Sequence, residues 1–113
     1  MSRSWISTDE ELRQGDCLIS ENGNYKAVFQ EDGNFVIYTW APVWASDTYG
    51  KSPFRILLQQ DANLVMYTKE DKPVWASGSY SADGNSRMRL TMSNEGQLVL
   101  DRNGKTVWRS AKK

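Results

Sequence analysis

A nine-residue pattern that occurs twice restricts the folds open to this chain more than any other feature. Residues 30–38 read QEDGNFVIY, and residues 59–67 read QQDANLVMY. The repetition extends to a tryptophan that follows each pattern and appears a third time, within PVWAS, PVWAS and TVWRS. These residues, spaced by 31 and 33 positions, are Trp44, Trp75 and Trp108. The spacing indicates three repeats of one structural unit.

The repeats alternate apolar and polar residues with a period of two, which is typical of β-strands. No window shows a sustained apolar spacing of three and four residues, and Gly, Asn, Asp and Ser separate the short apolar runs. The chain is therefore predicted to be all-β. We expect one domain over residues 1–113, with internal repeats at roughly 11–46, 47–77 and 78–113.

The alternation also predicts how the strands pair. If residues 31–33 form a three-residue hairpin loop, with Gly33 in the left-handed conformation, Gln30 lies opposite Asn34. Steps outward along both strands then place Phe29 opposite Phe35 on an apolar face. The further apolar pairs in this register are Ala27 and Ile37, Ile56 and Met66, Leu58 and Leu64, Leu90 and Leu100, and Met92 and Leu98. Ala62 stands where the first repeat has Gly33, so the loop type of the second repeat stays open.

Three sheets that each have one apolar face bury those faces most simply around a common axis. The repeated tryptophans are expected to fill this core, because one buried indole removes on the order of 150–250 Å² from water. Trp5 and Trp40 fall outside the repeat pattern and are expected at the surface.

The opposite face of each sheet carries a mixed set of side chains, copied between the first two repeats. Set 1 comprises Gln30, Asp32, Asn34, Val36 and Tyr38, and set 2 comprises Gln59, Asp61, Asn63, Val65 and Tyr67. Amide, carboxylate and phenol groups offer donors and acceptors side by side, as the vicinal hydroxyls of a sugar require, and the valine offers an apolar contact. The alternative is that Asp and Asn only form the turn. Retention of all five residues in two repeats favours a sugar-binding role over a purely turn-forming one.

Residues that carry catalysis are scarce. The chain has no histidine and one cysteine, Cys17, so it lacks a Ser-His-Asp arrangement, a His-ligated metal site and a thiolate zinc site. Asp32 and Asp61 hold the same place in their own repeats and are expected to be duplicates rather than a converging acid and base. We therefore expect no enzyme, no catalytic residue, no metal and no cofactor.

The pattern Gln-x-Asp-x-Asn-x-Val-x-Tyr, complete in sets 1 and 2, resembles the mannose-binding motif of the monocot bulb-type lectin family, the B-type lectin domain. The VWAS endings of the repeats also resemble those of this family, and the resemblance covers residues 12–110. It implies a β-prism of type II, with three four-stranded antiparallel sheets around a pseudo-threefold axis. It also implies calcium-independent binding of α-linked mannose. By this resemblance Asp32 and Asn34 hold the axial O2, and Gln30 and Tyr38 bind O3 and O4. Val36 contacts C3 and C4, and set 2 repeats these roles.

The third repeat departs from this pattern. Set 3 comprises Ser93, Glu95, Gln97, Val99 and Asp101, of which only the valine matches. Glu and Gln are longer than Asp and Asn, Ser is shorter than Gln, and Asp101 replaces a hydroxyl with a charge. We predict that this degenerate third site does not bind mannose. The disulfide positions of plant members correspond here to Gly33 and Phe54, so the chain is more similar to the bulb-lectin-like proteins of fish skin mucus.

The expected assembly follows from the low affinity of a single sugar site and from the family resemblance. A shallow site for one sugar has a dissociation constant on the order of millimolar, so useful binding needs several sites. The family implies a homodimer, formed by exchange of the C-terminal strand at residues 105–110, or a tetramer. The implied output is agglutination of mannose-rich microbes or parasites in innate defence.

Basic and acidic residues balance at 14 each, and the apolar runs are short, so we expect no nucleic acid partner and no membrane insertion. No signal peptide is visible, which predicts synthesis in the cytoplasm and release by a non-classical route to a surface such as mucus. The alternative function is a protein-binding or inhibitory module that uses Trp5, Trp40 or the loop at residues 78–86.

Overall fold

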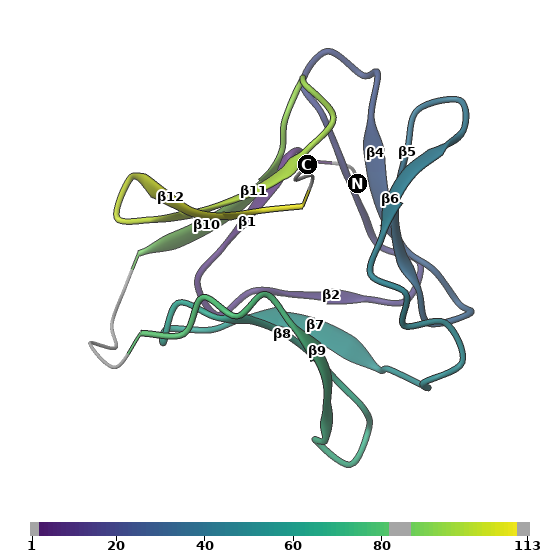
Figure 1. Ribbon diagram of the computed structural model, residues 1–113, viewed down its shortest axis with the longest axis vertical. Coiled ribbons are helices and arrows are strands. Elements are labelled where there is room, and N and C mark those ends of the chain that lie inside the picture. The colour runs from purple at the N-terminus through teal and green to yellow at the C-terminus, as the bar shows by residue number, and fades with distance from the viewer. Residues whose placement is uncertain (1–2, 82–86, 111–113) are drawn as a thin grey trace.

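Three β-sheets form the walls of a triangular prism, as Figure 1 shows. The computed structural model describes residues 3–81 and 87–110, and these residues form strands, turns and loops. The strands are β1 (Trp5–Ser7), β2 (Glu11–Arg13), β3 (Cys17–Ile19), β4 (Lys26–Phe29), β5 (Phe35–Tyr38), β6 (Pro42–Ala45), β7 (Arg55–Leu58), β8 (Leu64–Tyr67), β9 (Pro73–Ala76), β10 (Met88–Met92), β11 (Leu98–Arg102) and β12 (Lys105–Arg109). The described residues contain no helix long and apolar enough to cross a membrane.

Each sheet has four strands, in the orders β3-β4-β5-β6, β2-β7-β8-β9 and β1-β10-β11-β12. The strand pairs are antiparallel, which confirms the predicted architecture. The three short N-terminal strands, β1, β2 and β3, each belong to a different sheet. The N-terminal segment therefore serves all three sheets, an arrangement that the repeat pattern does not reveal. β12 pairs with β11 of its own chain, so the third sheet is complete without an exchanged strand.

The predicted register is confirmed in every repeat. Phe29 pairs with Phe35, Leu58 with Leu64 and Met92 with Leu98. The inward-facing members of these pairs are buried and together form one hydrophobic core. The match follows from the period of two, because a slip by one residue would turn the apolar side chains of a strand to the outer face.

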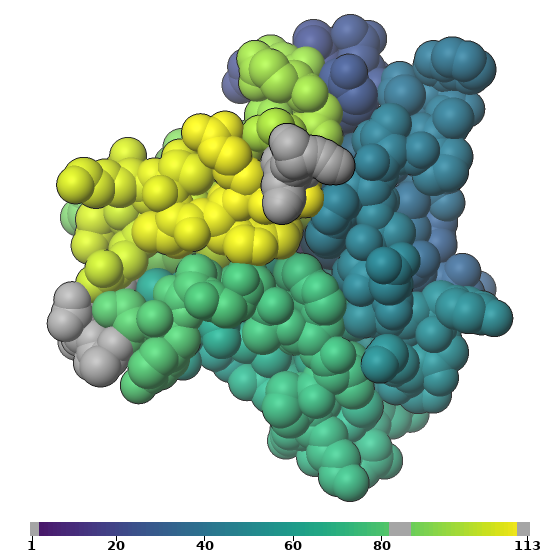
Figure 2. Space-filling model, viewed as in Figure 1, coloured from purple at the N-terminus to yellow at the C-terminus, as the bar shows by residue number. Residues whose placement is uncertain are grey.

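The three repeated tryptophans meet near the axis of the prism. Their ring centroids lie 6.2 Å (Trp44 to Trp75), 6.0 Å (Trp44 to Trp108) and 5.7 Å (Trp75 to Trp108) apart, each pair edge to face. The expectation that they fill the core needs a correction: they pack against the buried core but stay partly exposed themselves. The reason is that they lie on β6, β9 and β12, the edge strands of the sheets. Figure 2 shows the three sheets meeting at the centre of one face.

The other two tryptophans lie at the surface, as expected. Trp40 is 93% exposed, and Trp5 is 38% exposed with the Arg89 guanidinium 4.4 Å from its ring centroid. Residues 82–86 of the loop named above as a protein-binding candidate lie outside the described residues.

The hairpin loop that precedes β8 has the same conformation as its counterparts, which answers the question that Ala62 raised. Ala62 has a φ of 75°, close to the values of 91° at Gly33 and 88° at Gly96. The loop-closing hydrogen bonds are also equivalent, from Gln30 N to Asn34 O (2.8 Å) and from Gln59 N to Asn63 O (2.9 Å). The second repeat thus holds a non-glycine residue in the left-handed region, at some cost in backbone energy.

We predict that Gly33→Ala destabilises the protein more than Gly15→Ala does. Both glycines have positive φ, 91° and 94°, so an alanine at either site costs about 1–2 kcal/mol in backbone strain. A Cβ at Gly33 would also lie 2.7 Å from Pro53 Cδ, whereas one at Gly15 would meet nothing within 4 Å. Overpacking of this kind costs about 1–3 kcal/mol more. Urea unfolding of the two variants measures the difference, and equal losses would refute the steric argument.

Candidate functional site

Set 1 lies on the outer face of the first sheet, along β5 and the hairpin loop before it. The Gln30 amide nitrogen donates a hydrogen bond to the Tyr38 hydroxyl, which joins the two ends of the set. Between them Val36 is only 4% exposed although it lies on the outer face. The result is a shallow surface with a polar rim and an apolar floor.

Asp32 has two roles in this surface. Its Oδ1 accepts the Asn34 backbone N–H at 3.0 Å, and Oδ1 of Asp61 accepts the Asn63 backbone N–H at 3.1 Å. The turn-forming role considered from the sequence is therefore real. The turn uses one oxygen of each carboxylate. The second oxygen, which at Asp61 lies 3.3 Å from the reoriented Gln59 amide nitrogen, has a further lone pair that can accept a hydrogen bond from a ligand.

Two hydroxyl residues that sequence reasoning missed orient Asn34. Its Oδ1 accepts hydrogen bonds from Ser46 Oγ (3.2 Å) and from the Thr48 backbone N–H (3.2 Å). Ser46 Oγ also accepts the buried Phe35 N–H (3.1 Å), and Thr48 Oγ1 donates to Gly33 O (2.6 Å). Because the amide oxygen is occupied, the amide nitrogen remains as the donor toward the outer surface.

Set 2 has the same construction on the second sheet. Asn63 Oδ1 accepts from Ser77 Oγ (3.1 Å) and from the Ser79 backbone N–H (3.3 Å). Ser77 Oγ accepts the Leu64 N–H (3.1 Å), as Ser46 does for Phe35. The signal for these serines was present, since a serine closes each tryptophan repeat. The sequence does not show which residue the serine binds, because Ser77 and Asn63 lie 14 residues apart in the chain.

The glutamine of set 2 links its neighbours. The Gln59 amide lies against the Tyr67 hydroxyl and, when turned so that its nitrogen donates to Asp61 Oδ1 at 3.0 Å, its oxygen accepts a hydrogen bond from that hydroxyl; in the opposite orientation its nitrogen donates to the hydroxyl, as in set 1. The carboxylate, the amide and the phenol of the set are therefore held as one network, which orients them before any ligand arrives.

Three polar side chains of set 3 form hydrogen bonds within the protein. Ser93 Oγ accepts the Gln97 N–H (3.2 Å), Gln97 Oε1 accepts from Arg109 Nη1 (3.2 Å), and Asp101 Oδ1 accepts from Thr106 Oγ1 (2.8 Å). Ser110 Oγ still accepts the Leu98 N–H at 2.9 Å, as the equivalent serines do in the other repeats. The third repeat has thus kept the serine that supports the fold and has lost the outward-facing set.

A charged cluster flanks set 2, and the residues that the structure describes form no counterpart beside set 1. Arg55 on β7 lies opposite Tyr67, with its guanidinium 5.6 Å from the ring centroid, and pairs with Glu11 at 3.0 Å. Burial raises the pKa of Glu11, but hydrogen bonds from Arg55 and Arg13 outweigh it and lower that pKa below its usual value. Glu11 therefore stays ionised and fixes Arg55 beside set 2, whereas Lys26 holds the equivalent register position in the first sheet.

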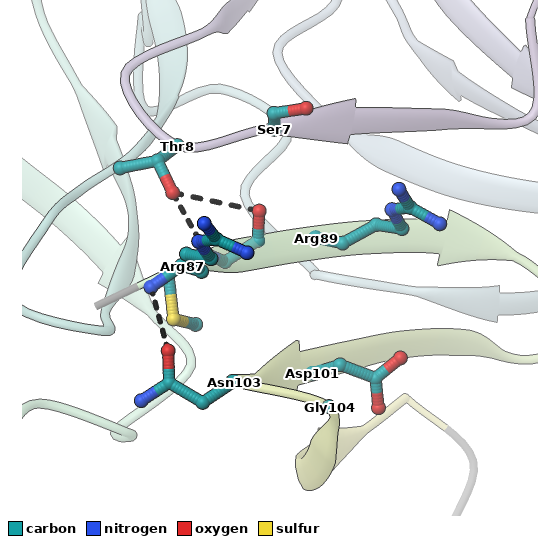
Figure 3. Close-up of a pocket in the computed structure, with 8 residues that line it drawn as sticks. Ser7, Thr8, Arg87, Arg89, Asp101, Asn103 and Gly104 are labelled. Carbon is teal, nitrogen blue, oxygen red and sulfur yellow. Dashed lines mark hydrogen bonds between the residues drawn. The ribbon is translucent and has the colours of Figure 1, made fainter.

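A hollow of about 640 Å³ lies on the third sheet, apart from sets 1 and 2. It is lined by Ser7, Thr8, Arg87, Met88, Arg89, Asp101, Asn103 and Gly104. Figure 3 shows that Asn103 and Thr8 accept hydrogen bonds in its wall, from the backbone N–H groups of Arg87 (3.0 Å) and Met88 (2.7 Å). These polar groups tie β10 to its neighbours, and of the three sets only set 3 contributes a residue, Asp101.

The arrangement can bind a hydroxyl-bearing ligand by hydrogen bonds. Asp32 and Asp61 precede β5 and β8, strands of different sheets, so they do not converge on one reacting group. Among the described residues there is no group of three or more His, Cys, Asp or Glu side chains that could hold a metal ion.

Comparison with known proteins gives consistent matches, although no protein-family model matches the chain. A B-type lectin, plumieribetin, from the fish Scorpaena plumieri is 48% identical over 109 residues and covers 96% of each chain. A mannose-specific lectin from Aloe arborescens is 32% identical over 88 residues, which are 76% of this chain and 78% of the plant protein. These relatives are lectins and not enzymes.

Solved structures share the fold. A monomeric mannose-binding lectin from Gastrodia elata superposes with a TM-score of 0.86 at 27% identity, covering 97% of this chain and 98% of the other. The mannose-specific agglutinin of snowdrop (Galanthus nivalis) bulbs, solved with methyl-α-D-mannoside, superposes with a TM-score of 0.79 at 30% identity, covering 87% and 88%. The three-sheet architecture is therefore that of the β-prism II bulb lectins.

Proposed function

Because the chain belongs to the B-type family of mannose-binding bulb lectins, we propose that it binds α-linked mannose and mannose-rich glycans through two sites, without calcium. Site 1 is set 1 and site 2 is set 2, as defined above. The function needs no catalytic group and no cofactor, since recognition is achieved by hydrogen bonds and one apolar contact.

One observation carries this proposal. All three repeats keep the inward-facing residues and the serine that closes the repeat, but only two keep the outward-facing set with its oriented asparagine. The fold is therefore complete without that set, as the third sheet demonstrates. A polar network that the fold does not require, retained in two copies, is best explained by a ligand.

The orientation of the side chains suits a sugar with an axial hydroxyl. The outward amide nitrogen of Asn34 donates, and the second carboxylate oxygen of Asp32 accepts, so one hydroxyl group can satisfy both. In the proposal this hydroxyl is O2 of mannose, while Gln30 and Tyr38 bind O3 and O4. Val36 contacts C3 and C4.

Titration calorimetry with methyl α-mannoside tests the proposal. Methyl α-glucoside is the matched control, because the two sugars differ only in whether the hydroxyl at C2 is axial. We expect two mannoside sites per chain, each with a dissociation constant on the order of millimolar, and the same result in EDTA. Glucoside should bind far more weakly. Equal affinity for both sugars would refute the role given to Asp and Asn, and no response to any sugar would favour the protein-binding alternative.

We predict that Ser46→Ala weakens site 1 while Ser110→Ala leaves sugar binding unchanged. Each serine accepts a backbone N–H, from Phe35 (3.1 Å) or Leu98 (2.9 Å), so either change leaves a buried donor unpaired. Both variants should lose about 1–3 kcal/mol of stability. Only Ser46 also holds a site asparagine, so only its loss should lower the mannoside stoichiometry toward one. Calorimetry at a temperature where both variants are folded measures this, and equal binding by both variants would contradict it.

The proposal extends to assembly. Sites of millimolar affinity reach useful avidity, greater by on the order of 10² to 10⁴, only when several engage one surface. We therefore propose self-association into a dimer, by exchange of β12, or into a tetramer that agglutinates mannose-rich microbes or parasites at an external surface such as mucus. Sedimentation velocity measures the assembly, and yeast agglutination inhibited by mannose measures the output. A monomer that does not agglutinate yeast would refute this extension and leave the two-site proposal standing.

A further inference from the structure

Two exposed tyrosines occupy equivalent positions beside the proposed mannose sites. Tyr49 lies three residues after Ser46, and Tyr80 lies three residues after Ser77, in the stretches SDTYG and SGSYS. Their exposures are 71% and 64%, so neither ring contributes much to the core. Single exposed aromatic residues are common on protein surfaces, but these two recur at one position of the repeat.

The backbone holds Tyr49 against site 1 from both sides. The residue before it, Thr48, donates its N–H to Asn34 Oδ1 at 3.2 Å, and the residue after it, Gly50, donates its N–H to Asp32 O at 3.1 Å. Consecutive Cα atoms are about 3.8 Å apart, so the Tyr49 side chain begins one residue from two anchors on the site.

The second repeat has the same anchors around Tyr80. The Ser79 N–H donates to Asn63 Oδ1 at 3.3 Å, and the Ser81 N–H donates to Asp61 O at 2.6 Å. The Asp and Asn of each site thus position an exposed ring in addition to their proposed contacts with the sugar.

The turn around Tyr49 explains why its side chain faces solvent. Lys51 N donates to Thr48 O at 3.1 Å, and Gly50 has a φ of 81°. A positive φ at the third residue of such a turn is typical of type II, which places Tyr49 at the second position.

The tyrosines accompany the intact sites only. In the third repeat the stretch after the closing serine reads SAKK, so Lys113 takes the position three residues after Ser110. Residues 111–113 lie outside the described residues, and the comparison here is of sequence alone. The repeat that has lost the outward-facing set therefore also lacks the aromatic residue, which indicates that the ring serves the same ligand as the set.

We propose that Tyr49 and Tyr80 each form an aromatic subsite that packs against the second sugar of an α-linked mannose oligosaccharide whose terminal mannose occupies the adjoining site. This inference rests on the proposed function. Asp, Asn, Gln and Tyr of each set bind the hydroxyls of one sugar, and a ring at the edge of that surface offers an apolar face to the C–H groups of the next. The tyrosines would thus make the sites selective for oligosaccharides over single sugars.

Calorimetry with disaccharides tests the subsite. The ligands are methyl α-mannoside and the α1,2-, α1,3- and α1,6-linked mannobioses, which are too small to bridge two sites and so exclude avidity. We expect at least one mannobiose to bind the wild-type protein roughly two- to tenfold more tightly than the monosaccharide, which is the size of a good aromatic contact. The double variant Tyr49→Ala with Tyr80→Ala should reduce this ratio to about one. Tyr49→Phe with Tyr80→Phe should keep most of it, because the ring remains.

The outcomes separate the subsite from the site beside it. If the alanine variant keeps the wild-type affinity ratio, or loses monosaccharide and disaccharide affinity by the same factor, the subsite is refuted. If no mannobiose binds the wild-type protein more tightly than the monosaccharide, the subsite is refuted while the mannose sites stand. If the wild-type protein binds no mannoside at all, the proposed function itself fails, and this inference fails with it.

Discussion

Replacing Trp75 with alanine is expected to lower the free energy of unfolding by about 3 kcal/mol, the lower end of the range for a large aromatic residue. The ring packs edge to face against Trp44 at 6.2 Å and Trp108 at 5.7 Å, and all three contact the buried core. Removing this ring takes one of its two edge-to-face tryptophan contacts from each of Trp44 and Trp108, which keep only their contact with each other within the cluster, and opens a gap where the three sheets meet. The partial exposure of the ring keeps the loss below that of a fully buried tryptophan.

Urea unfolding followed by far-UV circular dichroism measures this loss. Trp40→Ala is the matched control, because Trp40 is 93% exposed and its removal should change stability by no more than about 0.5 kcal/mol. If Trp75→Ala does not fold, Trp75→Phe should fold with a smaller loss, since it keeps an aromatic ring in the cluster. Equal stability of the Trp75 and Trp40 alanine variants would show that the cluster does not join the sheets.

Asp32→Asn combined with Asp61→Asn is expected to abolish measurable mannose binding. The substitution keeps an oxygen for the backbone N–H groups of Asn34 and Asn63, which now bond to the carboxylates at 3.0 and 3.1 Å, so the turns should persist. It removes the charge that strengthens a hydrogen bond from a sugar hydroxyl. That loss lowers affinity roughly 10- to 100-fold per site, which takes a millimolar site beyond detection.

The single variants and a charge-matched control make the measurement specific. Each single substitution should reduce the calorimetric stoichiometry from two sites to one, because the sites lie on different sheets. Glu95→Gln removes one negative charge in the third repeat and should leave both sites unchanged. A double variant that binds methyl α-mannoside as the wild-type protein does would show that the sites are assigned to the wrong residues.

The strand pairing was predictable because its information is local. Phe29 and Phe35 are six residues apart, and the alternation around them admits one register that buries both. The composition of sets 1 and 2 was predictable for a similar reason, since every second residue of one strand and its loop shares a face. The loss of the set in the third repeat was also visible in the residue types alone.

The orientation of the site residues was harder to predict from the sequence. Asn34 offers either end of its amide to a ligand until Ser46 and Thr48 occupy the oxygen, and these residues are 12 and 14 positions away. The sequence does not decide the left-handed conformation of Ala62, because the local preference of alanine opposes it and the surrounding loop imposes it. Both features depend on contacts between strands that the hairpin pattern alone does not contain.

The sequence by itself determined the fold class, the register of each hairpin, the two complete polar sets and the absence of that set from the third repeat, because each depends on residues within a few positions of one another. Tertiary structure decided the rest. It distributed β1, β2 and β3 to three different sheets, brought Trp44, Trp75 and Trp108 together on edge strands, and hydrogen-bonded the residues that flank Tyr49 and Tyr80 to sets 1 and 2. The sheet assignments and the tryptophan cluster depend on closing three sheets around one core, and the contacts beside the two tyrosines depend on the path of the chain after each third strand; both join residues too far apart for a local pattern to predict.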